Sequence, residues 1–149
     1  MMLCELAAFY KKQGKSVWDA MIDMYDKYGY YKEGQYAITM KGKEGAEQIA
    51  ALMDKLRNDP PKKFGQWTVE QFRDYKTHKT INMATGAEGD TGLPTSNVLY
   101  FALDNDAWCC ARPSGTEPKI KFYMGVKGKN LEDAEKLQNE LTEAVKSFI

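Results

Sequence analysis

Residues 112–121, RPSGTEPKIK, carry the side chains of this chain best suited to chemistry on a charged ligand. Arg112 offers a planar guanidinium that can donate two parallel hydrogen bonds to one oxyanion. Ser114 and Thr116 add hydroxyl donors, and Lys119 adds a second positive charge that can reach back over the loop. These donors together suit a phosphate dianion, so the sequence predicts a phosphate-binding loop.

The loop's backbone composition supports the same prediction. Pro113 and Pro118 stiffen its two shoulders, and Gly115 permits a tight or left-handed turn. The backbone N–H groups of residues 114–117 are then expected to converge as an anion-binding nest. A solvated hairpin turn is supported equally by the spacing alone, because short motifs match by chance. Glu117 would also repel phosphate unless its carboxylate points away.

Strand patterns on both sides of the loop indicate how it is held. Residues 98–103 and 107–111 read as two strands of a hairpin, joined by the turn-forming Asp-Asn-Asp of residues 104–106. Residues 119–126 alternate, with the even-numbered apolar positions facing one way and Lys119, Lys121 and Tyr123 facing the other. The loop is therefore expected at one edge of an antiparallel sheet.

The rest of the chain supplies helices and further strands. Residues 42–56 and the segment after Asn130 have helical apolar stripes, and Asn130 is a suitable N-cap. Shorter strands are expected at residues 36–40 and 67–75, and a long polar loop at residues 76–97. Helices outside a run of hairpin-linked strands predict an α+β fold, an antiparallel sheet covered by helices on one face.

Two helices are expected before this unit. The first covers residues 3–13 and ends at Gly14, and the second starts with a capping box in which Ser16 pairs with Asp19. Their apolar stripes have no evident partner of their own. We therefore expect residues 1–28 either to be disordered or to self-associate.

Composition excludes several classes of protein. The 149 residues hold 21 basic and 21 acidic side chains, which argues against a broad nucleic-acid or membrane-binding surface. The three cysteines and the lone His78 show no metal-ligand spacing, and no base is placed to activate Cys109 or Cys110. The sparse cysteines and the lack of a signal peptide or membrane span indicate a cytoplasmic protein.

Three segments resemble one known family. RPSGTEPKIKFY looks like the phosphate-binding loop of the α-D-phosphohexomutase superfamily, the phosphoglucomutases and phosphomannomutases. YGYYKEGQYAITMKGKEGAEQI resembles the join between the third and fourth domains of the bacterial branch. LPTSNVLYFAL, before the loop, and the helix beginning NLEDAEKL, after it, are also similar to that branch. The resemblance covers nearly the whole chain.

The resemblance implies a C-terminal fragment of such an enzyme. Residues 1–35 would be the last helices of the third domain, left from an α/β domain, and the hinge. Residues 36–149 would be the fourth domain, a TATA-box-binding-protein-like α+β fold. In this family the loop's Arg, Ser, Gly and Thr hold the phosphate of the sugar; these are Arg112, Ser114, Gly115 and Thr116 here. Lys119 joins them by charge and direction.

The function implied is a part of hexose phosphomutase chemistry, the interconversion of hexose 1-phosphate and 6-phosphate. The family's phosphoserine, magnesium and sugar-selecting loops have no match in this chain. No catalytic residue is therefore expected here, and Mg²⁺ and the activator hexose 1,6-bisphosphate are expected to act with the missing domains, the chain's natural partners. The choice between glucose and mannose phosphate stays open. The alternative is a stand-alone α+β module that binds a phosphorylated ligand or a protein.

Overall fold

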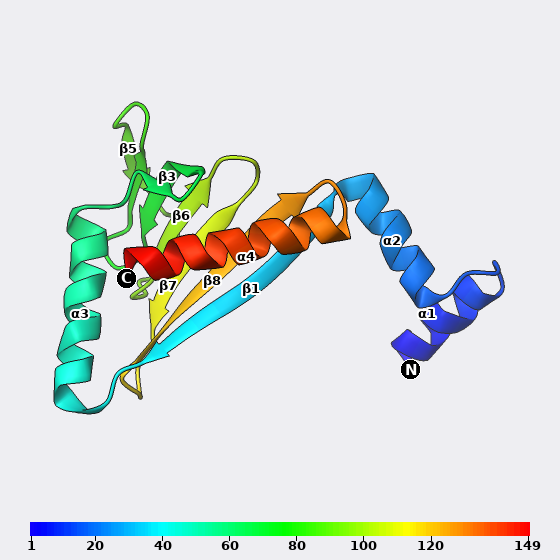
Figure 1. Ribbon diagram of the computed structural model, residues 1–149, viewed down its shortest axis with the longest axis horizontal. Helices are drawn as coiled ribbons and strands as arrows, with labels where there is room; N and C mark the ends of the chain where they lie inside the picture. Colours follow the sequence, from blue (N-terminus) through cyan, green and yellow to red (C-terminus); the bar gives the residue numbers. More distant parts are fainter.

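A computed structural model describes all residues, 1–149, as an α+β protein with one eight-stranded antiparallel sheet and four helices. The predicted fold class is confirmed. Strand order across the sheet is β1-β8-β7-β6-β3-β4-β5, and β2 pairs with β3 at the side (Figure 1). In chain order the elements are α1 (Met2–Lys11), α2 (Val17–Tyr28), β1 (Tyr30–Thr39), α3 (Gly42–Asn58), β2 (Lys63–Phe64), β3 (Trp67–Asp74), β4 (Lys79–Asn82), β5 (Glu88–Asp90), β6 (Leu99–Leu103), β7 (Trp108–Pro113), β8 (Lys119–Gly128) and α4 (Leu131–Phe148).

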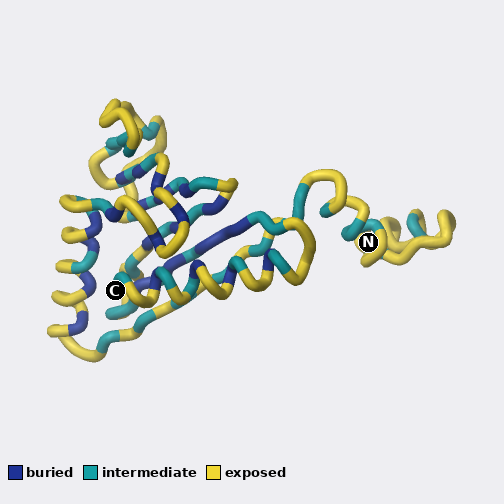
Figure 2. Tube along the Cα trace, turned by 45° about the horizontal axis from the view of Figure 1, so that its top comes forward, coloured by how far each residue is buried: buried dark blue, intermediate teal, exposed yellow.

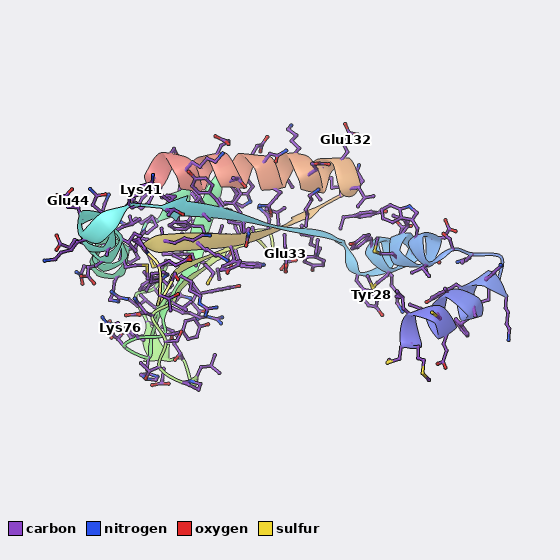
Figure 3. The ribbon with its side chains drawn as sticks, turned by 90° about the horizontal axis from the view of Figure 1, so that it is seen from below. Tyr28, Glu33, Lys41, Glu44, Lys76 and Glu132 are labelled. Carbon is purple, nitrogen blue, oxygen red and sulfur yellow. The ribbon has the colours of Figure 1, made fainter.

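One face of the sheet is covered by α3 and α4, and the other is open. Figure 3 shows α4 above β1 and β8, while the side chain of Glu33, on β1, points away from it. The single core cluster lies between the helices and the sheet. It contains Ile49, Met53 and Leu56 from α3, Leu141 and Val145 from α4, and the inward-facing residues of strands β3, β6, β7 and β8.

Strand β8 is the central element that positions the loop. It pairs along its length with β1 and over six residues with β7, where Arg112 lies opposite Lys121 and Cys110 opposite Tyr123. The predicted alternation is confirmed, because Ile120, Phe122, Met124 and Val126 are all buried. The intervening side chains therefore lie on the open face.

Two strand predictions were wrong. The segment expected as a strand of residues 36–40 is a ten-residue strand, β1, that begins at Tyr30. The segment expected as a loop, residues 76–97, contains β4 and β5, which extend the sheet beyond β3. Both errors concern sheet edges, where one side of the strand faces solvent and apolar alternation is weak. Pairing with β8 and β3 supplies the missing stabilisation.

Helices α1 and α2 project away from the sheet (Figure 1). The predicted capping box is present, with Ser16 Oγ accepting from the backbone N–H of Asp19 at 3.1 Å. Neither helix contains a buried residue, as the yellow and teal trace shows (Figure 2). Large apolar side chains such as Trp18, 54% exposed, and Met24, 49% exposed, lie on them. Self-association through residues 1–28 stays a prediction.

A buried ion pair ties α3 to the strand end near the site. Asp74, at the end of β3, is 1% exposed and accepts from Arg57 Nε at 3.0 Å and from Thr77 Oγ1 at 2.7 Å. The guanidinium of Arg57 also donates to Asp54 and to the side-chain oxygen of Asn97, both at 2.8 Å. One arginine therefore fixes the segment before β6 against α3.

Candidate anion-binding site

The predicted loop joins the ends of the neighbouring strands β7 and β8. It is closed by its own hydrogen bonds. The N–H of Ser114 donates to the carbonyl of Lys119 at 2.7 Å. Ser114 Oγ accepts long hydrogen bonds from the N–H groups of Thr116, at 3.4 Å, and Glu117, at 3.3 Å. Only Gly115 keeps an unpaired N–H among residues 114–117. The expected nest of four converging amides is therefore wrong, because the serine hydroxyl and the turn use three of them.

An exposed hollow of about 340 Å³ lies where the loop meets the open face of the sheet. We call it the anion hollow, and it is lined by Arg112, Pro113, Ser114, Gly115, Thr116, Lys121 and Tyr123. The loop between the strands provides Ser114, Gly115 and Thr116, and Pro113 ends β7. Arg112 from β7 and Lys121 and Tyr123 from β8 reach it because they occupy the outward positions of paired strands.

The side-chain donors that β7 and β8 contribute to the anion hollow are not used within the chain. Neither Arg112 nor Lys121 takes part in any ion pair. The hydroxyl of Tyr123 makes no hydrogen bond either. Glu117 lines a separate hollow behind the loop and not the anion hollow, so its carboxylate would not contact an anion bound there. A phosphate-sized anion would meet positive charge and hydroxyl donors on several sides.

The structure brings together four of the five predicted binding residues, Arg112, Ser114, Gly115 and Thr116. Lys119 lies on the same side of β8, but it sits at the strand's first position, opposite Thr39, and does not line the hollow. Lys121, and not Lys119, is the lysine of β8 that lines the hollow. Sequence reasoning missed Lys121 and Tyr123, although the period-two alternation of β8 had already placed both on the same face as Lys119.

Of the two conformations expected at Gly115, a tight or a left-handed turn, the left-handed one is absent. The φ of Gly115 is not positive, and a Cβ atom built there would meet no atom within 4 Å. The glycine is therefore not needed for a left-handed turn, and it leaves open space in front of the loop.

Gly115→Ala is consequently expected to leave the melting temperature unchanged or raise it, since losing a glycine stabilises by about 0.4–1 kcal/mol where the backbone allows it. The same methyl group should weaken phosphate binding, because it occupies the surface that an oxyanion must approach. Thermal melts and a phosphate titration followed by amide chemical shifts check both halves. A melting temperature lowered by several degrees would show that the loop needs glycine for its conformation.

A second hollow lies behind the loop. It has a volume of about 560 Å³ and is lined by one face of α3, by Asn97 and by residues 113–118, including Glu117. The loop thus separates this helix-side hollow from the anion hollow. Its walls offer apolar side chains, such as Ile49 and Met53, and no cation. Although it is the larger of the two, its lining does not suit a phosphate.

The remaining reactive side chains form no site. Cys109 is buried, and burial raises the pKa of its thiol. Burial also raises the pKa of Cys110, on the open face, to about 11, although the charge of Arg112 acts in the opposite direction. His78 Nε2 lies 2.7 Å from Thr95 Oγ1. No three His, Cys, Asp or Glu side chains are grouped so that they could hold a metal ion. No helix is both long enough and apolar enough to cross a membrane.

The fold and the anion hollow together define an α+β domain that presents basic and hydroxyl donors at the end of an open sheet.

No family model matches the chain. It is 34% identical over 131 residues to a phosphoglucomutase of Staphylococcus haemolyticus, covering 88% of this chain and 24% of that protein. It is 36% identical over 140 residues to a probable phosphomannomutase of Haemophilus influenzae, covering 93% and 25%. These matches bear out the resemblance to the phosphoglucomutases and phosphomannomutases.

The chain spans about a quarter of the length of these relatives, which fits the expected C-terminal portion. Among solved structures, the open form of parafusin, a phosphoglucomutase of Paramecium, matches 95% of this chain and 25% of its own. That match has a TM-score of 0.47 and 11% identity.

Proposed function

We propose that this chain is the substrate-phosphate-binding domain of a hexose phosphomutase, the enzyme that interconverts hexose 1-phosphate and hexose 6-phosphate. The observation that carries the proposal is the anion hollow, in which Arg112 and Lys121 lie opposite each other with no acidic partner. The relatives named phosphoglucomutase and phosphomannomutase support the same assignment. The helices α1 and α2 would then be the last helices of the preceding domain.

In this proposal the domain binds and orients the substrate. Arg112 would hold two phosphate oxygens, and Lys121, Ser114 and Thr116 would complete the contacts from the sides. Fixing one phosphate would aim the other end of the hexose at a reactive phosphoserine in another domain, and holding a substrate in that geometry lowers the barrier to transfer. In the same proposal, Mg²⁺ and the bisphosphate activator would act with the remainder of the enzyme.

The 149-residue chain alone is expected to show no mutase activity. Phosphoryl transfer needs an activated nucleophile and charge neutralisation in the transition state. The raised pKa values of Cys109 and Cys110 keep both thiols protonated at neutral pH. The serine hydroxyl that donates to a carboxylate, Ser16 Oγ to Asp19 at 2.7 Å, caps α2 and lies outside the anion hollow. A coupled assay with glucose 1-phosphate and glucose 1,6-bisphosphate on the purified chain checks this. Turnover that co-purifies with the chain and is lost in Arg112→Ala would contradict it.

The direct test of the proposed function is a titration of the chain with inorganic phosphate, followed by amide chemical shifts. We expect saturable shifts at residues 112–116 and at Lys121, weak in affinity because the domains that would close the site are absent. Sodium chloride at equal ionic strength is the control for charge screening. Shifts that fail to saturate, or that are spread evenly over the lysines, would remove the support for a phosphate-binding domain.

A further inference from the structure

Tyr123 is the one aromatic side chain that lines the anion hollow. It follows Lys121 by two residues on β8 and lies opposite Cys110, which precedes Arg112 by two residues on β7. The order along both strands, moving away from the loop, is therefore the basic pair Arg112 and Lys121 and then Tyr123. The tyrosine therefore lies on the side of the basic pair that faces away from the loop, on the open face of the sheet.

Other aromatic side chains of the open face already have partners. Tyr100 stacks on Trp108 with ring centroids 5.9 Å apart, and the guanidinium of Arg73 lies 5.2 Å from the Tyr100 ring. Tyr123 takes part in no aromatic or cation–π pair, and its hydroxyl makes no hydrogen bond. It is partly exposed. Its ring and hydroxyl are both available beside the basic pair.

The binding of a free phosphate ion does not by itself require a tyrosine at position 123. The strong phosphate donors are the two cations and the loop hydroxyls, whereas a phenol ring offers an apolar surface with a single polar tip. A phosphate ester of a sugar has matching parts, because its carbon skeleton presents C–H groups and hydroxyls beside the phosphate. Ligand sites of this kind combine an apolar wall with a few polar groups that fix orientation.

We propose that Tyr123 contacts the sugar of a hexose phosphate whose phosphate occupies the loop. The ring packs against the carbon skeleton, and the hydroxyl hydrogen-bonds a sugar hydroxyl. The inference rests on the proposed function, because it needs the phosphate to bind between Arg112 and Lys121. It adds a residue that distinguishes a hexose phosphate from other phosphate monoesters of the same charge.

The test compares glucose 6-phosphate with glycerol 3-phosphate, a monoester of equal charge that has no ring. Each is titrated into the 149-residue chain and followed by amide chemical shifts. The wild-type chain is expected to bind glucose 6-phosphate about fivefold more tightly, the combined effect of the ring contact and the hydrogen bond in an open site. Tyr123→Val should reduce this ratio to about one, because any change in the contact with the phosphate group affects both ligands equally and cancels in the ratio. Tyr123→Phe should lower the ratio only in part.

Tyr31→Val is the matched control. Tyr31, on β1, lies opposite Lys127 of β8. Lys127 follows Tyr123 by four residues, a separation of about 13 Å along the strand. This variant should keep the wild-type ratio. A ratio near one in the wild type, or a fivefold ratio that survives in Tyr123→Val, overturns the inference. The proposed function still stands in that case if phosphate shifts the amides of residues 112–116. If no phosphate compound binds, both fail. If Tyr123→Val does not fold, an unchanged ratio in a folded Tyr123→Phe overturns the role of the hydroxyl.

Discussion

Asp74→Ala is expected to lower the free energy of unfolding by about 3–5 kcal/mol, the effect of removing one partner from a buried ion pair. Asp74 is 1% exposed and accepts hydrogen bonds from Arg57, from the Thr77 hydroxyl and from the backbone N–H of Lys76. The substitution leaves all three donors without this acceptor. Since small proteins are stable by only about 5–15 kcal/mol, the variant should unfold at a much lower urea concentration.

Asp54→Ala is the matched control, because Asp54 pairs with the same arginine but its side chain is 65% exposed. That variant should lose no more than about 1 kcal/mol, as is usual for exposed ion pairs. The Asn97 side chain, which accepts from Arg57, should shift in the spectrum of Asp74→Ala and so report movement in the wall of the helix-side hollow. Equal losses in the two aspartate variants would show that burial of Asp74 does not determine its contribution.

Arg112→Ala is expected to weaken phosphate binding by about tenfold to one-hundredfold. A hydrogen bond to a charged group contributes about 1.5–3 kcal/mol, and Arg112 has no other partner in the chain. Arg112→Lys should recover only part of the loss, because an ammonium group cannot donate in the bidentate manner. The melting temperature should change little, since the side chain is exposed and lies outside the core. Phosphate titration and thermal melts of the three proteins provide the measurement.

Two lysine variants sharpen this experiment. Lys121→Ala should weaken phosphate binding more than Lys119→Ala does, because only Lys121 lines the anion hollow. Both lysines are on β8 and both face away from the core, so net charge and strand position are closely matched. Arg112→Ala with unchanged affinity in a folded protein would refute the assignment of the hollow. A larger effect at Lys119 would place the anion nearer the start of β8.

Local signals predicted much of the fold. The alternation of residues 119–126, the Asp-Asn-Asp turn before Ala107 and the caps at Ser16 and Asn130 all depend on neighbours within four residues, and all are present. Asn105 and Asp106 adopt positive φ values of 57° and 59°, which side chains of this type tolerate best after glycine. Such features are readable because the physical cause lies in the same short stretch as the residue.

Edge strands and buried polar contacts could not be read in this way. The first part of β1 contains Glu33 and Gly34, and β5 is Glu-Gly-Asp, so neither carries an apolar alternation. Gln138 is 5% exposed in α4 because Gly34, on β1, leaves room for it; a Cβ atom at position 34 would lie 2.5 Å from its amide nitrogen. Gly34 and Gln138 are about one hundred positions apart, so no short stretch of sequence predicts their contact.

The sequence by itself determined which groups are offered: an arginine just before Pro113, and two hydroxyls and a glycine between Pro113 and Pro118. Tertiary structure decided how those groups are used. The pairing of β7 with β8 places Lys121 beside Arg112 and brings Tyr123 to the same hollow, while Lys119 remains outside it. The physical reason is that the register between strands sets which outward side chains become neighbours, and register is a property of the assembled sheet.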